Sequence, residues 1–407
     1  MRVTPLLCIV ATVATVLAGC GGRAASDDTS AGLGGPPIKI GQIAPTGTST
    51  YNAPDSVAVA RAAVRGVNAR GGVDGRPLEL VYCNNENDPN KAAACARKMV
   101  SEHVVATVRT IVIAGGDQVS AILAAGGIPD VGRGALIPAE FAAPNAYLLD
   151  GGVIYPYSAV LQRFAEKGGK RVFLAATESA SAEATFSVLT KLAARLGVSV
   201  VGQAKIAPST ADYAPFIANV QQSGAEAVLP AFTQQMILQS VKAADQAGLH
   251  VEWLLNGGGI TQQDLTGLPV DQTSRMIVGT GTMPLSAAGQ NEGVARMKAD
   301  IEAQFTSGDA AADPNRLFAT ALISWEAVNL LATLLKGQQT IDASTVTAAL
   351  NGAKELDVAV SVPWTPSRPG PAGFPRVSHP YVYLSTVQNG ELVLVQPDPV
   401  DVGGLVS

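Results

Sequence analysis

The sequence predicts an α/β protein whose parallel sheets are covered by helices on both faces. Two observations predict this class: short apolar or β-branched segments alternate with amphipathic segments of helical spacing, and the connections between them are short. Repeated strand–helix units of this kind form parallel sheets joined by right-handed crossovers. About 370 residues follow the pattern, which is too many for one ordinary core and suits two lobes.

The N-terminal segment has the features of an export signal. Arg2 supplies a positive charge, residues 6–18 are almost entirely apolar, and small residues precede Cys20. This run is shorter than the roughly 18 residues that a membrane-spanning helix needs, so we interpret residues 1–19 as a signal peptide. The Leu-Ala-Gly-Cys sequence ending at Cys20 resembles the lipobox of bacterial lipoproteins, which implies lipidation of Cys20. The alternative is an ordinary secretory signal that happens to contain a cysteine.

Residues 20–37 are expected to form a lipidated flexible tether. They contain Gly, Ser, Ala, Asp and Pro without apolar periodicity, and such a segment cannot bury enough surface to order itself. No later segment has the length and continuity of a transmembrane helix, so the lipid is the only membrane contact that we expect. The net charge of −5, without a run of lysine or arginine, argues against a nucleic-acid partner. These features predict a protein on the outer face of the plasma membrane.

The folded part begins at residue 38 with a strand that alternates apolar and polar positions. Pro54 suits the first turn of the next helix, which the glycine-rich turn at 71–75 ends. The strands expected from apolar or β-branched runs are 38–43, 78–82, 104–113, 171–176, 198–206, 225–232 and 251–255. The helices expected from apolar spacing are 54–67, 88–102, 157–167, 182–196, 213–222, 234–247, 291–305 and 317–336. At the end, strands 381–387 and 392–396 flank Asn389-Gly390, a strong signal for a two-residue hairpin.

Two cysteines, Cys83 and Cys95, remain once the signal peptide is removed and Cys20 is lipidated. In an oxidising compartment, a pair at this spacing is more consistent with a disulfide than with a metal site. Two free thiols are the alternative.

Four stretches carry a resemblance to a known family: 38–47 (IKIG before PTG), 68–78 (NARGGVDGRPL), 87–92 (NDPNKA) and 247–249 (AGL). Together they resemble type I periplasmic solute-binding proteins of the leucine/isoleucine/valine-binding (branched-chain amino acid) subgroup. The resemblance covers the chain from residue 38 to its end.

The resemblance implies two Rossmann-like lobes joined by a three-strand hinge, with the ligand between them. Lobe 1 would contain residues 38–149 and 284–377, and lobe 2 residues 150–283 and 378–407. Ligand contacts in open α/β sheets come from loops at the carboxyl ends of strands, which are the same loops that the resemblance selects.

In the first lobe, Tyr51 follows the first strand in a hydroxyl-rich loop, at or beside the position where relatives place an aromatic side chain. Arg133 and Gly134 follow a later short strand. A guanidinium in a glycine-rich loop suits a carboxylate ligand, and a solvated surface cation is the alternative for Arg133.

The loop of Gly115, Gly116 and Gln118 precedes a helix, so its backbone amides are a candidate anion site. In amino-acid-binding relatives this loop is rich in serine. The threonine and the acidic residue with which relatives bind the amino group would fall at Leu136 and Gly257, which cannot bind it. We therefore expect a small organic acid, an amide or a similar polar compound in preference to an ordinary α-amino acid.

In the second lobe, five residues at strand ends are candidates for ligand contact: Tyr155, Ser181, Phe232, Thr233 and Asn256. Each also has a structural interpretation. The two aromatic residues would suit the core or hinge, Ser181 and Thr233 would suit helix caps, and Asn256 would suit a turn.

The sequence does not predict an enzyme. It lacks the Walker loop, the G-x-S-x-G elbow and the H-E-x-x-H motif, and its three histidines have no carboxylate or cysteine at a suggestive spacing. No cofactor or metal is expected. The predicted function is that of a monomeric solute-binding protein that delivers a small molecule to the membrane permease of an ABC-type importer. The alternative is a ligand-sensing co-receptor that signals through a membrane partner.

Overall fold

The computed structural model describes residues 32–49, 51–179 and 182–405 of the 407-residue chain. The predicted signal peptide, Cys20, most of the predicted tether and Ser181 lie outside the described residues. Among the described residues, no helix has the length and apolar character required to cross a bilayer.

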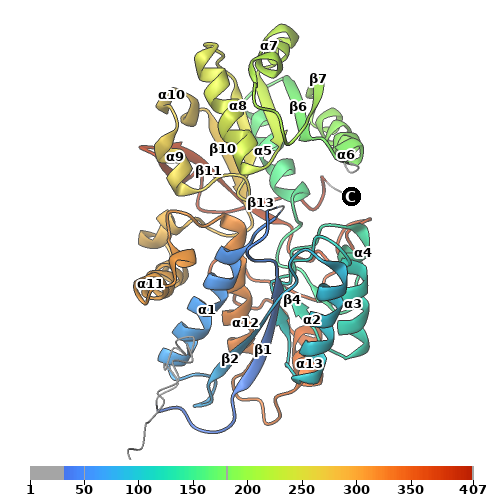
Figure 1. Ribbon diagram of the computed structural model, residues 1–407, viewed down its shortest axis with the longest axis vertical. Coiled ribbons are helices and arrows are strands. Elements are labelled where there is room, and N and C mark those ends of the chain that lie inside the picture. The colour runs from blue at the N-terminus through green and yellow to red at the C-terminus, as the bar shows by residue number, and fades with distance from the viewer. Residues whose placement is uncertain (1–31, 50, 180–181, 406–407) are drawn as a thin grey trace, which may run out of the picture.

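One lobe, here called lobe 1, contains a parallel sheet of strand order β2-β1-β3-β4-β5 (Figure 1). Its strands are β1 (Ile38–Ala44), β2 (Leu78–Asn84), β3 (Thr107–Val108), β4 (Asp130–Val131) and β5 (Ala146–Tyr147). Its helices are α1 (Pro54–Ala69), α2 (Pro89–Ser101), α3 (Gly116–Ala125), α4 (Pro138–Phe141), α11 (Glu292–Thr306), α12 (Ile323–Leu335) and α13 (Ala343–Gly352). Side chains alternate across β1, so Ile38 and Ile40 pack towards α1 and α12, whereas Ile43 packs towards α2 and α3.

The other lobe, lobe 2, contains a larger sheet of strand order β12-β11-β10-β9-β8-β6-β7. Five strands are parallel: β6 (Arg171–Thr177), β7 (Ser199–Ile206), β8 (Ala227–Ala231), β9 (Glu252–Asn256) and β10 (Met276–Thr280). Three are antiparallel to their neighbours: β11 (Tyr381–Gln388), β12 (Glu391–Leu394) and β13 (Val400–Asp401). The helices are α5 (Ile154–Glu166), α6 (Ala182–Arg195), α7 (Ala214–Ser223), α8 (Gln234–Gln246), α9 (Gln262–Gly267) and α10 (Val270–Thr273).

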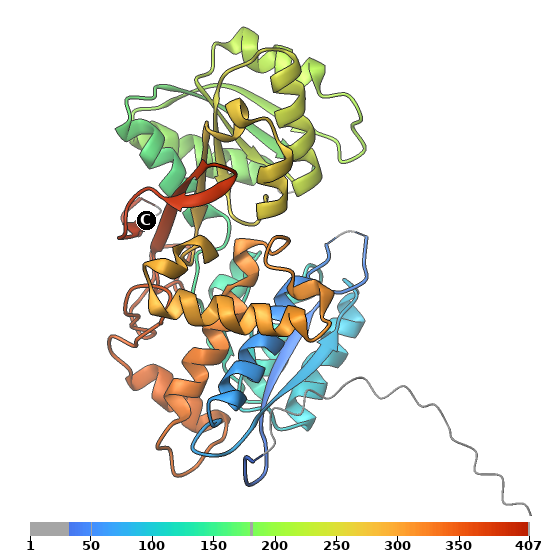
Figure 2. The same ribbon diagram turned by 90° about the vertical axis from the view of Figure 1, so that its left-hand side faces the viewer.

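The chain passes between the two lobes three times: between β5 and α5, after β10, and before β11. The first and third passages lie side by side, because Leu148 and Val377 form a parallel bridge. Figure 2 shows the consequence: α11–α13, in orange, lie with the N-terminal strands, whereas the C-terminal hairpin, in red, lies against lobe 2. The architecture confirms the predicted α/β class, with one parallel sheet and a second sheet that is mostly parallel.

Most predicted elements are present within a few residues, and the hairpin is confirmed. Asn389 and Gly390 both have positive φ, as a two-residue turn of this type requires. Two predictions were wrong or incomplete. The strand expected over 104–113 is regular only at β3, because Arg109 has a φ of +43° and leaves the strand conformation there; beyond it, Ile111 forms an isolated parallel bridge with Gly134. The sequence patterns also did not predict α13.

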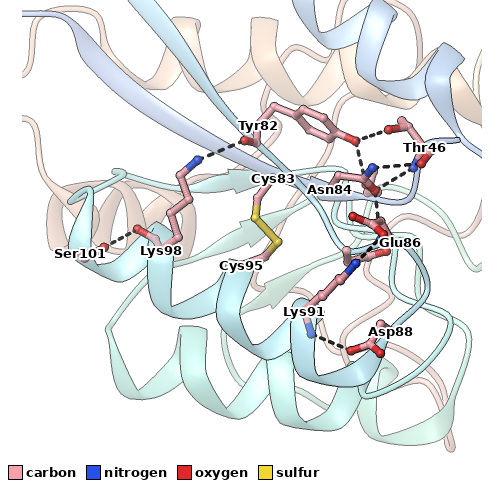
Figure 3. The surroundings of a disulfide bond; sticks show 12 residues. Thr46, Tyr82, Cys83, Asn84, Glu86, Asp88, Lys91, Cys95, Lys98 and Ser101 are labelled. Atoms are coloured by element: carbon pink, nitrogen blue, oxygen red, sulfur yellow. Dashed lines mark hydrogen bonds and ion pairs between the residues drawn. A yellow bond between two sulfur atoms is a disulfide. The ribbon is translucent and has the colours of Figure 1, made fainter.

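The predicted disulfide is present and joins β2 to α2 through Cys83 and Cys95 (Figure 3). Beside it, Asn84 accepts a hydrogen bond from the Thr46 amide at 3.0 Å and donates one to the Thr46 carbonyl at 3.0 Å. The Nδ2 of Asn87 donates to the carbonyl of Tyr51 at 2.9 Å. The segment after β2 therefore positions the loop that contains Tyr51.

Candidate ligand-binding cleft

A cavity of about 310 Å³ lies between the two lobes. It lies at the carboxyl ends of β3 and β4 in lobe 1 and of β8, β9 and β10 in lobe 2, where loops follow the strands. Four of the predicted ligand residues line it: Tyr51, Gly134, Phe232 and Asn256. The structure therefore brings together candidates that are up to 205 positions apart, from Tyr51 to Asn256 (256 − 51).

Six other candidates do not line this cavity: Gly115, Gly116, Gln118, Arg133, Tyr155 and Thr233. The case of Arg133 is the clearest. Its side chain is 1% exposed, with Nη1 2.9 Å from Asp130 and Nη2 paired with Glu140. The guanidinium is thus the centre of a buried Asp–Arg–Glu cluster, and it is not the solvated surface cation that we considered as the alternative.

The glycine loop before α3 is packed against the same cluster. The carbonyl of Gly116 accepts a hydrogen bond from Nη2 of Arg133 at 3.2 Å, and a Cβ on Gly116 would lie 2.1 Å from Oε1 of Glu140. Gly115 has a φ of +79°, which favours glycine. Close packing therefore explains Gly116 and the backbone conformation explains Gly115. Neither explanation involves a ligand.

Among the second-lobe candidates, Tyr155 is buried against Phe374, with ring centroids 6.0 Å apart. Tyr157 lines the cavity instead, because two positions along α5 turn the side chain to another face of the helix. Thr233 occupies the N-cap position of α8 without a side-chain capping bond.

Asn256 combines the two roles that the sequence left open. Its Oδ1 accepts from the amide of Gly258 at 2.8 Å, as a turn residue would, and its Nδ2 donates to the hydroxyl of Tyr157 at 2.6 Å. That hydroxyl donates in turn to the Pro230 carbonyl at 3.0 Å. Burial raises the pKa of Tyr157 well above its usual value, so the hydroxyl stays protonated.

Sequence reasoning missed the charged pair of the cavity, Arg109 and Asp150. The Nη1 of Arg109 lies 3.1 Å from Oδ2 of Asp150 and donates to the Gly132 carbonyl at 3.2 Å. Asp150 also accepts from the Gly152 amide at 3.0 Å. One signal was available: an arginine is an exception within a run that otherwise suits a strand buried on both faces.

Two further carboxyl groups, those of Asp55 and Glu326, lie close enough to interact electrostatically with this pair. Burial raises the pKa of Asp55, although the amides of Ser56 and Phe318 donate to its carboxyl group. Burial, and then the charge of Asp150, raise the pKa of Glu326 well above its ordinary value, and neither oxygen of Glu326 has a partner among the described residues. Both groups therefore favour the neutral form more than an exposed carboxyl group does.

The second departure from the amino-acid-binding pattern, at Gly257, has a steric explanation. A Cβ on this residue would lie 2.7 Å from Cβ of Ala319 and 2.6 Å from Cγ2 of Thr280. The place of the expected acidic side chain is thus occupied by Thr280 of lobe 2 and Ala319 of lobe 1, and the Ala319 amide donates to the Gly257 carbonyl at 3.0 Å.

This contact belongs to a longer interlobe connection, which we call the lobe bridge and define as residues 257–263 with residues 315–319. Its other contacts are an antiparallel bridge between Thr261 and Phe318, a bond from the Gln263 amide to the Asn315 carbonyl at 2.7 Å, and a bond from Nε of Arg316 to Oε1 of Gln263 at 2.7 Å. The two lobes are therefore bonded to each other along one edge of the cleft.

The described residues contain no cluster of metal-ligating side chains. The fold and the cavity define the class: a two-lobed α/β protein with a cavity between its lobes at the ends of their strands. More specifically, the chain belongs to the periplasmic binding protein family, of the branched-chain amino acid-binding type, because the family model matches residues 37–388. This match confirms the resemblance seen in the sequence. The family consists of solute-binding proteins rather than enzymes, which confirms the corresponding prediction.

Solved structures of the same fold include a fatty acid ABC transporter substrate-binding protein from Thermomonospora curvata (TM-score 0.73, 16% identity, covering 92% of this chain and 95% of the other). A solute-binding protein from R. palustris, solved with 4-hydroxybenzoate, gives a TM-score of 0.69 at 18% identity and covers 90% and 97%. A branched-chain amino acid transporter substrate-binding protein from Streptococcus pneumoniae, solved with isoleucine, gives 0.66 at 16% identity and covers 90% and 99%. No curated protein sequence matches the chain.

Proposed function

We propose that the protein is the lipid-anchored receptor of an ABC-type importer and captures a small organic molecule outside the plasma membrane. The observation that carries this proposal is the cavity of about 310 Å³ at the strand ends of both lobes. Cavities with mostly apolar walls and a few placed polar groups are typical of small-molecule sites. The solved relatives support a small organic ligand, since one holds isoleucine and another 4-hydroxybenzoate.

The mechanism is capture by a two-state clamp. Lobe 1, with proposed limits 38–149 and 284–377, and lobe 2, with proposed limits 150–283 and 378–407, rotate about the three passages of the chain. Ligand binds one lobe first, and closure by the other removes it from water. A dissociation constant in the micromolar range, about −8 kcal/mol, is ordinary for such a site. The closed, monomeric receptor then docks on the permease.

A thermal-shift screen tests the capture of a ligand. The protein without residues 1–31 retains the contacts of Gly34 and Pro36 with the turn at 75–76, so it is the form to use. Amino acids, organic acids, amides, polyols and aromatic acids form the panel. A ligand present at 100 times its dissociation constant stabilises the folded state by about 2.7 kcal/mol. A panel without any stabilising member contradicts the proposed function.

The position of the site is tested with Tyr51→Ala, which removes an aromatic wall of the cavity. We expect weaker ligand binding and an unchanged urea midpoint, because the Tyr51 side chain is 43% exposed. Phe305→Ala is the matched control: this aromatic residue is similarly exposed, on α11 and outside the cavity lining. A variant that loses stability and keeps its affinity would show that Tyr51 is a core residue.

The anchor and the importer role need separate tests. Cys20→Ala should abolish incorporation of labelled palmitate and release the protein from the membrane fraction, and retention of both would contradict the anchor. Deletion of the gene should abolish uptake of the ligand. Normal uptake together with a lost ligand-dependent response would favour the co-receptor instead.

A further inference from the structure

We infer that the cleft selects an organic monocarboxylate with an apolar body and no ammonium group, and that Arg109 binds its carboxylate. This inference rests on the proposed function and adds the chemical class of the ligand.

Arg109 has donors left for a ligand. Both hydrogen bonds of its guanidinium use Nη1, to Gly132 and Asp150, whereas the buried Nε has no partner among the described residues. The side chain is only 5% exposed, so an unused donor there is costly in the absence of an acceptor. Nη2 has no hydrogen bond among the described residues and is not fully buried, so it can donate to an oxygen of a ligand carboxylate.

The backbone of Arg109 supports the same conclusion. Its φ of +43° is rare for a residue other than glycine, and such strain persists where the surrounding structure holds a residue in a required position. This conformation ends β3 and coincides with the point where the chain reaches the cavity. Because β-branched and apolar residues surround it in sequence, no local pattern requires an arginine here.

The charges around the cavity do not suit an ammonium group. Arg109 and Asp150 are the charged residues of the described lining, and Asp150 already accepts from Arg109 and from the Gly152 amide. Asp55 and Glu326 lie near but outside the lining, and burial shifts both towards the neutral form.

Apart from Asp150, the described lining from lobe 2 contains no carboxylate. Its other polar side chains are those of Tyr157, Thr185, Asn256 and Thr280, all of which are uncharged. The position of the expected acidic residue, Gly257, is closed by Ala319. An ammonium group would therefore have to share Asp150, which already pairs with Arg109, and burying a charge without a counter-charge of its own is unfavourable.

The rest of the cavity suits an apolar body. Leu136 and Val153 are each 48% exposed in the cavity lining, although most side chains of their size are buried in this protein. Tyr51, Ile111 and Phe232 add apolar surface. A ligand that covers these side chains removes apolar area from water, which favours closure.

The test compares ligands of equal shape by isothermal titration calorimetry on the protein without residues 1–31. Leucine, 4-methylpentanoate and 4-methylpentanamide differ only in the ammonium and carboxylate groups, and benzoate with benzamide repeats the comparison on an aromatic body. We expect 4-methylpentanoate to bind at least about tenfold more tightly than both its amide and leucine, or benzoate to bind at least about tenfold more tightly than benzamide. Arg109→Met should then lower the affinity for that acid by at least about tenfold.

Arg97→Met, an exposed arginine on α2, is the matched control and should leave affinity unchanged. Tighter binding of leucine, or equal binding of acid and amide with no effect of Arg109→Met, overturns the inference and leaves the proposed function standing. Because the ligand comparison uses the unmutated protein, it decides the question even if Arg109→Met fails to fold. Absence of binding by every compound in this set and in the broader screen contradicts both proposals.

Discussion

We expect Arg133 to stabilise the folded state rather than to bind ligand, and the substitution Arg133→Met tests this expectation. The substitution removes the charged partner of two buried carboxylates, since Asp130 and Glu140 both pair with this guanidinium. Each carboxylate keeps one set of contacts: Asp130 accepts from Thr110 at 2.8 Å, and Glu140 accepts from the Leu136 amide at 2.7 Å. Removing one partner of a buried ion pair destabilises by about 3–5 kcal/mol, and with two carboxylates involved we expect the upper part of that range.

Urea unfolding followed by circular dichroism measures the effect, with Arg97→Met as the exposed control. An Arg133→Met variant with an unchanged urea midpoint and lost ligand affinity would refute this reasoning and return Arg133 to the ligand site.

Two other predictions concern stability. Replacing Cys83 and Cys95 together by alanine opens a link with a sequence separation of 12, which on chain-entropy grounds should cost about 3 kcal/mol of unfolding free energy; an unchanged urea midpoint under non-reducing conditions would contradict this. Glu326→Gln removes a carboxyl group whose pKa is raised by burial, so the unmutated protein should lose stability as the pH rises above about 4.5 and the variant should lose less. Parallel pH profiles of the two proteins would show that Glu326 ionises freely in the folded state.

The regular elements were predictable because their signals are local. Helical spacing after Pro54 and the Asn389-Gly390 turn depend on residues that are neighbours in sequence, and α1 and the β11–β12 hairpin follow. The cysteine pair was predictable for a related reason, since its compartment and spacing leave few alternatives.

The site was less predictable because the burial of a side chain depends on the whole fold and not on its neighbours in sequence. Arg133 and Arg109 both occur near strand ends, yet the sequence does not say that one meets Asp130 and Glu140 while the other meets a cavity. Tyr155 and Tyr157 illustrate the same limit on one helix. Both are buried aromatic residues at the start of α5, and the tertiary packing decides that the face of Tyr155 meets Phe374 from a distant segment whereas the face of Tyr157 meets the cavity.

The lobe bridge affects how strongly the shape of such a receptor depends on whether a ligand is bound. Contacts between residues 257–263 and 315–319 involve no ligand, so they favour the same interlobe arrangement in the empty protein as in the loaded one. A receptor that already populates its competent shape gains apparent affinity, because less of the ligand's binding energy is used to shift the population. The same contacts make the interlobe arrangement of the empty protein more similar to that of the loaded protein. Scarce solute would then be captured efficiently, while a partner that recognises the closed outline would also encounter molecules that carry nothing.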